Sequence, residues 1–188
     1  MARLPLLGPE DAGPAAARLL RRIGSERRRI FNVYRLLAHS PGVLEHVYGL
    51  ASYLWNESEL PPALQELVIL RVAQLTGSDY EWNRHLVLAE RVGVPAAQID
   101  ALGRWEAAEG RFDPGERAAL ALADEATREV AATAATVRAV RTMFGNRATL
   151  ELTALVGLYG MVARLLRSLD LDPEAEDTVI PDPDIYPK

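Results

Sequence analysis

The sequence predicts an all-α protein that is built around a central helical hairpin. Apolar residues recur at spacings of three and four along most of the chain, which is typical of helices that bury one face. The alternating pattern of half-buried strands is missing throughout the sequence. Two apolar segments, 61–76 and 78–93, are separated by Gly77, and glycine often ends a helix in the left-handed conformation. We therefore expect these two segments to form an antiparallel hairpin.

A chain of 188 residues suits one domain with one substantial core. We expect this single helical domain over residues 14–170. Residues 1–13 are interrupted by proline and glycine, which predicts an irregular N-terminal arm. Residues 171–188 are rich in proline and have no periodicity, which predicts a C-terminal tail.

Start signals mark several of the helices. Ser40-Pro41 and Asp113-Pro114 each place a capping side chain before a proline, which has no N–H to lose at the first helical position. Ser78 or Asp79 is expected to cap the second helix of the hairpin. Outside the hairpin, helices are expected at about 14–23, 30–37, 41–54, 96–102, 114–130, 133–143 and 147–169.

Composition excludes several classes of protein. The formal net charge of -5 argues against a nucleic-acid partner, because phosphate backbones are bound by clustered Lys and Arg. We interpret the basic run within residues 21–29 as a solvated face or a subunit contact, with an anion-binding patch as the alternative. The absence of cysteine excludes disulfides, thiolate nucleophiles and cysteine-ligated zinc. With no apolar stretch of about 20 residues and no signal-peptide pattern, we expect a cytoplasmic protein that does not contact a membrane.

Four polar side chains on the hairpin form a candidate site. Glu66 lies in an apolar helix, where an unpaired carboxylate is costly to bury. Glu81 and His85 are four residues apart on one face of the next helix, with Ser78 one turn earlier. At ~1.5 Å per residue, Glu66 lies ~16 Å, His85 ~12 Å and Glu81 ~6 Å from the turn at Gly77. The two carboxylates could therefore bracket the imidazole, which would suit proton transfer near neutral pH.

Two other interpretations of this spacing stay open. A Glu–His pair four residues apart is common on exposed helix faces, where it contributes only a few tenths of a kcal/mol. Alternatively, Glu66, Glu81 and His85 could hold a metal, although a second well-placed histidine is missing. For the two remaining histidines, His39 and His46, we expect capping or packing roles.

The sequence resembles the carboxymuconolactone decarboxylase family, which shares its fold with alkyl hydroperoxidase D. The resemblance is strongest over about 35–105, and it includes Ala38-His39-Ser40-Pro41 before the hairpin. It rests mainly on Leu60-Pro61-Pro62, Glu66-Leu67-Val68-Ile69-Leu70-Arg71-Val72-Ala73, Tyr80-Glu81-Trp82-Asn83-Arg84-His85 and Gly93-Val94. It implies an oligomeric helical bundle of the alkyl hydroperoxidase D type.

The peroxidase branch of this fold has a Glu, a CxxC pair and a His four residues after the second Cys. The Glu matches Glu66 and the His matches His85, but the two Cys positions match Ser78 and Glu81. Peroxide reduction by a thiol relay is therefore excluded. The decarboxylase branch also lacks the thiol pair, and its members remove carbon dioxide from a small lactone acid by acid–base chemistry. This chain is longer than those compact decarboxylases.

Together these observations predict a lyase or isomerase that needs no cofactor and acts on a small organic acid or lactone. His85 would be the acid, Glu81 would orient the ring or share its proton, and Glu66 would support them. Ser78, Arg71 and Arg84 are the candidate substrate-binding residues. A binding or accessory protein on the same scaffold is the alternative function, and a metal-dependent variant is a third.

We also expect the protein to associate with itself. The segment 64–75 is apolar on nearly every side, so that one covering layer of the same chain would leave part of it exposed. Relatives in the family form rings of two, three or six chains, and a trimer or hexamer is the expected assembly here.

Overall fold

The computed structural model describes residues 2–174, and every regular element in that range is a helix. The predicted all-α fold is therefore confirmed. The chain divides into two compact units. The first is made of Met1–Asn56 together with Leu165–Lys188, and the second is Glu57–Arg164. Each unit is described by itself below.

The single domain expected over residues 14–170 stays a prediction, because compactness does not establish whether either unit folds alone. Most of the expected tail, residues 175–188, lies outside the described residues.

The first unit contains α1 (Pro14–Arg27), α2 (Asn32–Leu37) and α3 (Pro41–Glu57), whose last residue begins the second unit. As predicted, α1 begins at a proline and α3 begins directly after Ser40. The three helices share a buried apolar cluster, made of Ala16, Leu20, Ile23, Phe31, Tyr34, Leu37, Ala38, Leu44 and Tyr48.

Residues 2–13 have no helix, as expected of an arm, and hydrogen bonds hold them to the rest of the first unit. The Leu7 N–H donates to the Arg35 carbonyl at 3.2 Å. The His39 ring shares a hydrogen bond of 2.8 Å with the carbonyl oxygen of Pro5. His39 therefore helps to pack the arm.

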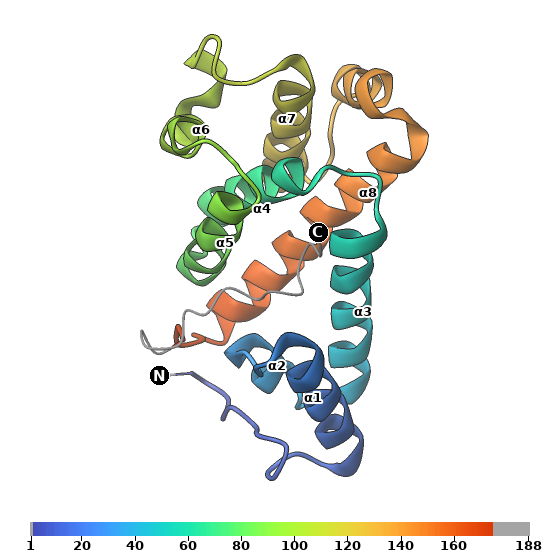
Figure 1. Ribbon diagram of the computed structural model, residues 1–188, viewed down its shortest axis with the longest axis vertical. Coiled ribbons are helices and arrows are strands. Elements are labelled where there is room, and N and C mark those ends of the chain that lie inside the picture. The colour runs from blue at the N-terminus through green and yellow to red at the C-terminus, as the bar shows by residue number, and fades with distance from the viewer. Residues whose placement is uncertain (1, 175–188) are drawn as a thin grey trace. The chain divides into compact units, whose positions relative to one another are not determined.

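The second unit contains the hairpin and three further helical segments. They are α4 (Pro62–Thr76), α5 (Asp79–Arg91), α6 (Ala96–Ala101), the 3₁₀ helix η1 (Leu102–Ala107), α7 (Pro114–Arg128) and α8 (Ala134–Ser168), whose last four residues belong to the first unit (Figure 1). An apolar cluster from α4, α5, η1 and α7 forms the core of this unit, with Leu67, Leu70, Ala89, Leu102, Trp105 and Leu120 among its members.

The hairpin forms as the sequence predicts. Gly77 has φ 61° and ψ 37°, which is the left-handed conformation, and it separates α4 from α5. The Ser78 N–H donates back to the Ala73 carbonyl at 2.9 Å and closes the end of α4. Residues Leu64–Ala73 are all buried within the single chain. The apolar character of α4 is thus explained by burial in the same chain, and it gives no argument for a second subunit.

The capping signal at Asp113 is also confirmed. The Glu116 N–H donates to the Asp113 side chain, and the Asp113 N–H donates to the Glu116 carboxylate, each at 2.8 Å. This reciprocal pair satisfies two backbone donors at the start of α7.

The two helices expected at 133–143 and 147–169 are joined into α8, but Gly145 interrupts the helical backbone with φ 83° and ψ 177°. Within residues 2–174, α8 is the one helix long and apolar enough to cross a membrane by length and composition. Of its most apolar window, 56% is buried inside the protein, which is typical of a core helix.

Replacing Gly77 by alanine tests the hairpin turn. A Cβ in the left-handed region costs about 1–2 kcal/mol, so Gly77→Ala should lower the free energy of unfolding by this amount in a urea titration. Gly49→Ala is the matched control, because Gly49 lies inside α3 with open space around it. There alanine should stabilise the protein by about 0.5–1 kcal/mol. Equal effects at both positions would contradict the turn geometry.

Candidate active site

Three polar side chains meet inside the hairpin of α4 and α5. The His85 Nδ1 lies 2.7 Å from the Glu66 Oε2, and the His85 Nε2 lies 3.5 Å from the Glu81 Oε2. The exposed fractions are 4% for His85, 0% for Glu66 and 5% for Glu81. One imidazole is therefore held between two carboxylates and is shielded from bulk water. We call these three residues the Glu/His cluster.

Helix geometry accounts for this meeting. Glu81 and His85 lie one turn apart on the buried face of α5, whose other buried residues are Leu88 and Ala89. Glu66 projects from the neighbouring helix α4 and reaches the Nδ1 of His85, while Glu81 lies by the Nε2, which agrees with the order of the three residues from the turn at Gly77. The bracketing of His85 that the sequence suggested is therefore present in the structure.

Tyr159 covers the imidazole from α8. Its ring is perpendicular to that of His85, at an interplanar angle of 87°, and the ring centroids are 4.9 Å apart. Such an edge-on contact fixes the plane of the imidazole and excludes water from that side. Sequence reasoning missed Tyr159. The only available signal was a phenol ring in an otherwise apolar stretch of the helix.

The Glu66 contact determines where the histidine carries its proton. An ionised carboxylate only accepts hydrogen bonds, so a bond of 2.7 Å to Glu66 places a proton on the His85 Nδ1. In the neutral ring the Nε2 is then an acceptor, and it faces Glu81. A protonated Glu81 could donate toward this nitrogen, which lies 3.5 Å from its Oε2. Glu81 and the Nε2 of His85 are thus arranged as a donor and an acceptor.

Burial raises the pKa of the Glu81 carboxyl above its ordinary value. The positive charges of His85 and Arg84 act against this increase, and the negative charge of Glu66 adds to it. Desolvation is the largest of these effects, because a charged carboxylate loses its hydration inside the protein. Glu81 is therefore the member of the cluster suited to carry a proton at a pH where exposed carboxylates are ionised.

Ser78 is the N-cap residue of α5 by position, as predicted, but its side chain does not supply the expected capping hydrogen bond. The serine is only 2% exposed, and its Oγ has no hydrogen-bond partner within residues 2–174. A buried hydroxyl without a partner costs about 1–3 kcal/mol. This cost would be removed by a ligand oxygen or a water molecule near the start of α5.

Arg71 forms its contacts away from the Glu/His cluster, chiefly with Asp124. Its guanidinium donates to both carboxylate oxygens of Asp124 on α7, at 2.5 and 2.7 Å, and also to Gln74 and to the carbonyl of Leu102. These bonds tie α4 to α7 and η1, and they give Arg71 a structural role in place of the expected contact with substrate. Asp124 was missed by sequence reasoning, although a lone acid among the apolar residues of that helix was a signal.

Arg84 lies half-buried on α5, three residues after Glu81. Its positive charge lowers the pKa of the Glu81 carboxyl, so the two side chains are electrostatically linked. Arg84 therefore lies close enough to influence the cluster.

A metal centre receives no support from the described part of the chain. Within residues 2–174 no group of three or more His, Asp or Glu side chains is arranged to hold an ion. Glu66, Glu81 and His85 face one another instead, as hydrogen-bonding and ionic partners.

The fold and the cluster define a helical protein of the alkyl hydroperoxidase D type whose site has no thiols. Residues 41–125 match the sequence model of the carboxymuconolactone decarboxylase family. The resemblance inferred from the hairpin is therefore confirmed. A search of the curated proteins finds no match.

Several solved structures share the fold. A peroxidase-related protein from Ralstonia eutropha has 16% identity and a TM-score of 0.78, and the match covers 100% of this chain and 98% of that one. A peroxidase-related protein from Silicibacter has 19% identity and a TM-score of 0.76, covering 93% of both chains.

The debrominase Bmp8, as a cysteine-to-alanine variant in complex with 2,3,4-tribromopyrrole, has 19% identity and a TM-score of 0.74. The match covers 93% of this chain and 95% of that one. At these identities the likeness establishes the fold alone.

The raised pKa of Glu81 can be tested through stability. A raised carboxyl pKa contributes stability that is present below the ordinary value of 4.5 and is lost as the pH rises through the value in the folded protein. Glu81→Gln should therefore gain stability relative to the parent as the pH rises above 4.5, by about 1.4 kcal/mol for each unit of the shift. Urea titrations across pH 4–8 measure this difference.

Glu90→Gln, on the exposed side of α5, controls for the general loss of a carboxylate. If Glu81→Gln instead lost stability relative to the parent as the pH rose, ionic pairing with His85 would outweigh desolvation, and the proposed proton on Glu81 would be wrong.

Proposed function

We propose that the protein is a lyase or isomerase that acts on a small organic acid or lactone by acid–base chemistry within the Glu/His cluster, without a cofactor. The observation that carries this proposal is the buried imidazole held between Glu66 and Glu81. Perturbed titratable groups that face one another out of water are typical of catalytic sites. The match of residues 41–125 to the decarboxylase family model, and the debrominase activity named for a protein of the same fold, support a reaction on a small molecule.

In this proposal the cluster supplies a proton to carbon. Loss of carbon dioxide leaves the bonding electron pair on the substrate as an enolate-like carbanion, which must be protonated. The Nε2 of His85 donates that proton to the carbanion. Glu81 then takes up a proton from solvent and passes it to the ring. Glu66 holds the Nδ1 side of the ring and stabilises the charged imidazolium that forms when Nε2 is protonated. An isomerase would use the same groups to remove a proton and return it.

Ser78 and the start of α5 are the proposed contact for the substrate. The unpartnered Ser78 hydroxyl is buried at the end of α5 where backbone N–H groups lack helical partners. Donors at a helix N-terminus favour a carboxylate or an enolate oxygen. Arg84 adds a positive charge near Glu81. Arg71 is left out of the substrate contact, because Asp124 already binds its guanidinium.

Activity is tested by assaying small lactone acids and unsaturated diacids for release of carbon dioxide and for change in ultraviolet absorbance. With an accepted compound, His85→Gln should lower kcat about 10²–10⁴-fold, because the proton donor is lost. His39→Gln is the control, since this ring only packs the N-terminal arm. Unchanged kcat in a folded His85→Gln variant would refute the proposal.

A binding or accessory protein is the second candidate function. The observation that favours it is the burial of the cluster, which leaves 5% or less of each residue exposed. Under this alternative the Glu–His–Glu contacts only stabilise the hairpin. Calorimetric titration with the same compounds separates the two functions, because saturable binding without product would support the accessory role.

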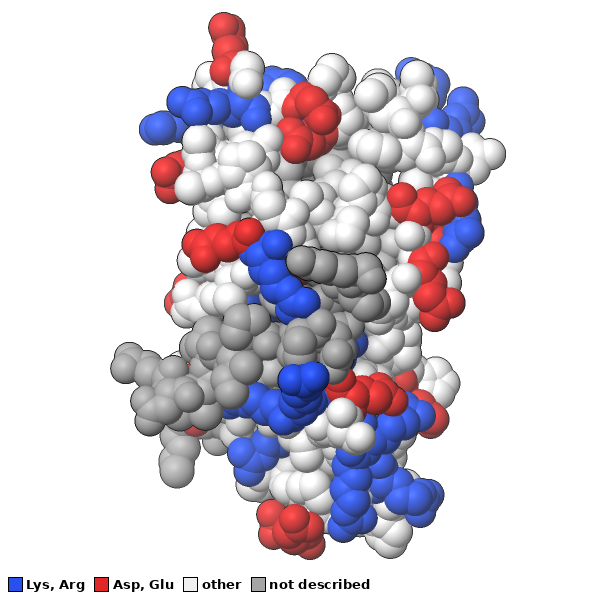
Figure 2. Space-filling view, viewed as in Figure 1, with Lys and Arg blue, Asp and Glu red and all other residues white. Residues whose placement is uncertain are grey.

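We further propose a cytoplasmic protein that assembles as a trimer or hexamer and has no nucleic-acid or membrane partner. Large apolar side chains remain exposed, among them Val130 at 84% and Leu150 at 71%, which supports self-association. Acidic and basic side chains are interspersed on the face seen in Figure 2, which is unlike the basic surfaces that bind nucleic acids. Light scattering after size-exclusion chromatography should report three or six chains, and a monomer would contradict this expectation.

A further inference from the structure

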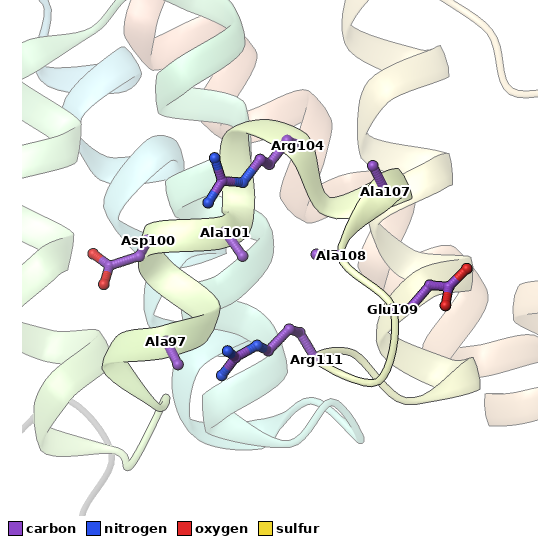
Figure 3. Close-up of a pocket in the computed structure, with 8 residues that line it drawn as sticks. All are labelled: Ala97, Asp100, Ala101, Arg104, Ala107, Ala108, Glu109 and Arg111. Atoms are coloured by element: carbon purple, nitrogen blue, oxygen red, sulfur yellow. The ribbon is translucent and has the colours of Figure 1, made fainter.

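A second group of polar side chains lies on α6, η1 and the loop that follows, apart from the Glu/His cluster. These segments line an open hollow of about 410 Å³ at the surface (Figure 3). Four small residues, Ala97, Ala101, Ala107 and Ala108, line it together with charged side chains. The volume is within the range of about 300–1,000 Å³ that holds small ligands.

Two arginines border this hollow without a side-chain partner among the described residues. The guanidinium groups of Arg104 and Arg111 have no hydrogen bond or ion pair with another side chain among residues 2–174. Asp100 and Glu109 also line the hollow, and Figure 3 shows their carboxylates on opposite sides of it, directed outward. The two guanidinium groups therefore line the same hollow, and neither forms an ion pair with Asp100 or Glu109.

The backbone that carries these arginines is held in place. Gln98 on α6 donates to the carbonyl of Arg111 at 2.7 Å and to the carboxylate of Glu116 at 2.9 Å. Arg117 on α7 donates to the carbonyls of Trp105 and Glu106, at 3.1 and 2.9 Å. Donors presented from a fixed backbone lose less entropy when they bind a ligand.

An adjoining hollow of about 230 Å³ shares Arg104 and Ala107 with the first. Trp105 lines it, and its Nε1–H is buried and finds no hydrogen-bond partner in the described part of the chain. The indole nitrogen is a donor only. Among residues 2–174, three groups on η1 and the next loop thus offer hydrogens without a side-chain acceptor: the two exposed guanidinium groups, which water can hydrate, and the buried indole N–H. A ligand with acidic oxygens could accept from them.

We propose that this region binds a small dicarboxylate at a site separate from the Glu/His cluster. The planar fork of a guanidinium matches the two oxygens of a carboxylate, and Arg104 and Arg111 provide two such forks. The alanines of the hollow contact the short carbon chain between the two acidic groups. This site does not depend on the proposed reaction, because none of its residues belongs to the cluster.

Isothermal titration with succinate tests the site in the full-length protein. One succinate should bind per chain, and Arg104→Gln and Arg111→Gln should each weaken binding at least about 10-fold, since each removes a charge-assisted hydrogen bond to a carboxylate. Arg138→Gln, an exposed arginine on α8, should leave the affinity unchanged. Succinamide, which has the same carbon chain without charge, should not bind.

Circular dichroism confirms that each variant is folded before it is titrated. No saturable binding of succinate, or equal binding by parent and Arg104→Gln, would overturn the proposal. Binding of inorganic phosphate without succinate would also overturn it. His85→Gln should bind succinate normally. A loss of binding in that variant would assign succinate to the cluster and refute a separate site.

Discussion

The ionic and hydrogen-bonding contact between Glu66 and His85 is the constraint on which the second unit depends. Glu66 is fully buried in a helix whose neighbouring positions are apolar, and an uncompensated charge there would cost several kcal/mol. The contact of 2.7 Å supplies the compensation only when α4 and α5 are in the right register. A shift of either helix by one turn would leave a buried carboxylate without its partner. The Glu66–His85 pair therefore specifies how α4 packs against α5, and apolar contacts alone would leave this packing less well defined.

Arg71 and Asp124 apply the same principle on the side of α4 that faces α7. Two oxygens and two nitrogens form a forked ion pair that is almost completely buried. The central helix thus carries two charged residues, and each is matched by one neighbouring helix. This arrangement explains why a helix that is buried on nearly every side can retain Glu66 and Arg71.

The hairpin and its cluster could be predicted because the signals are local. Gly77 marks the turn, the spacing of Glu81 and His85 places them on one face, and the distance from the turn fixes the height of Glu66. Asp113 likewise predicted the start of α7. These features depend on residues within one or two helices, where periodicity and capping preferences determine the geometry.

The features that sequence reasoning missed depend on long-range packing. Tyr159 reaches His85 from a helix more than 70 positions away, and Asp124 lies 53 positions from Arg71. A periodic pattern identifies the buried face of a helix but not the helix that covers it. The unpartnered Ser78 hydroxyl was missed for another reason, because a serine before a helix normally caps it.

The composition of the cluster has a consequence for how the protein responds to its chemical surroundings. Where relatives of the peroxidase type carry two sulfur atoms, this chain has a hydroxyl at Ser78 and a carboxyl at Glu81. Oxygen and nitrogen groups of this kind exchange protons but do not cycle between thiol and disulfide. The state of the site is therefore set by acidity alone, and neither thiol-alkylating reagents nor the ambient glutathione potential should alter it.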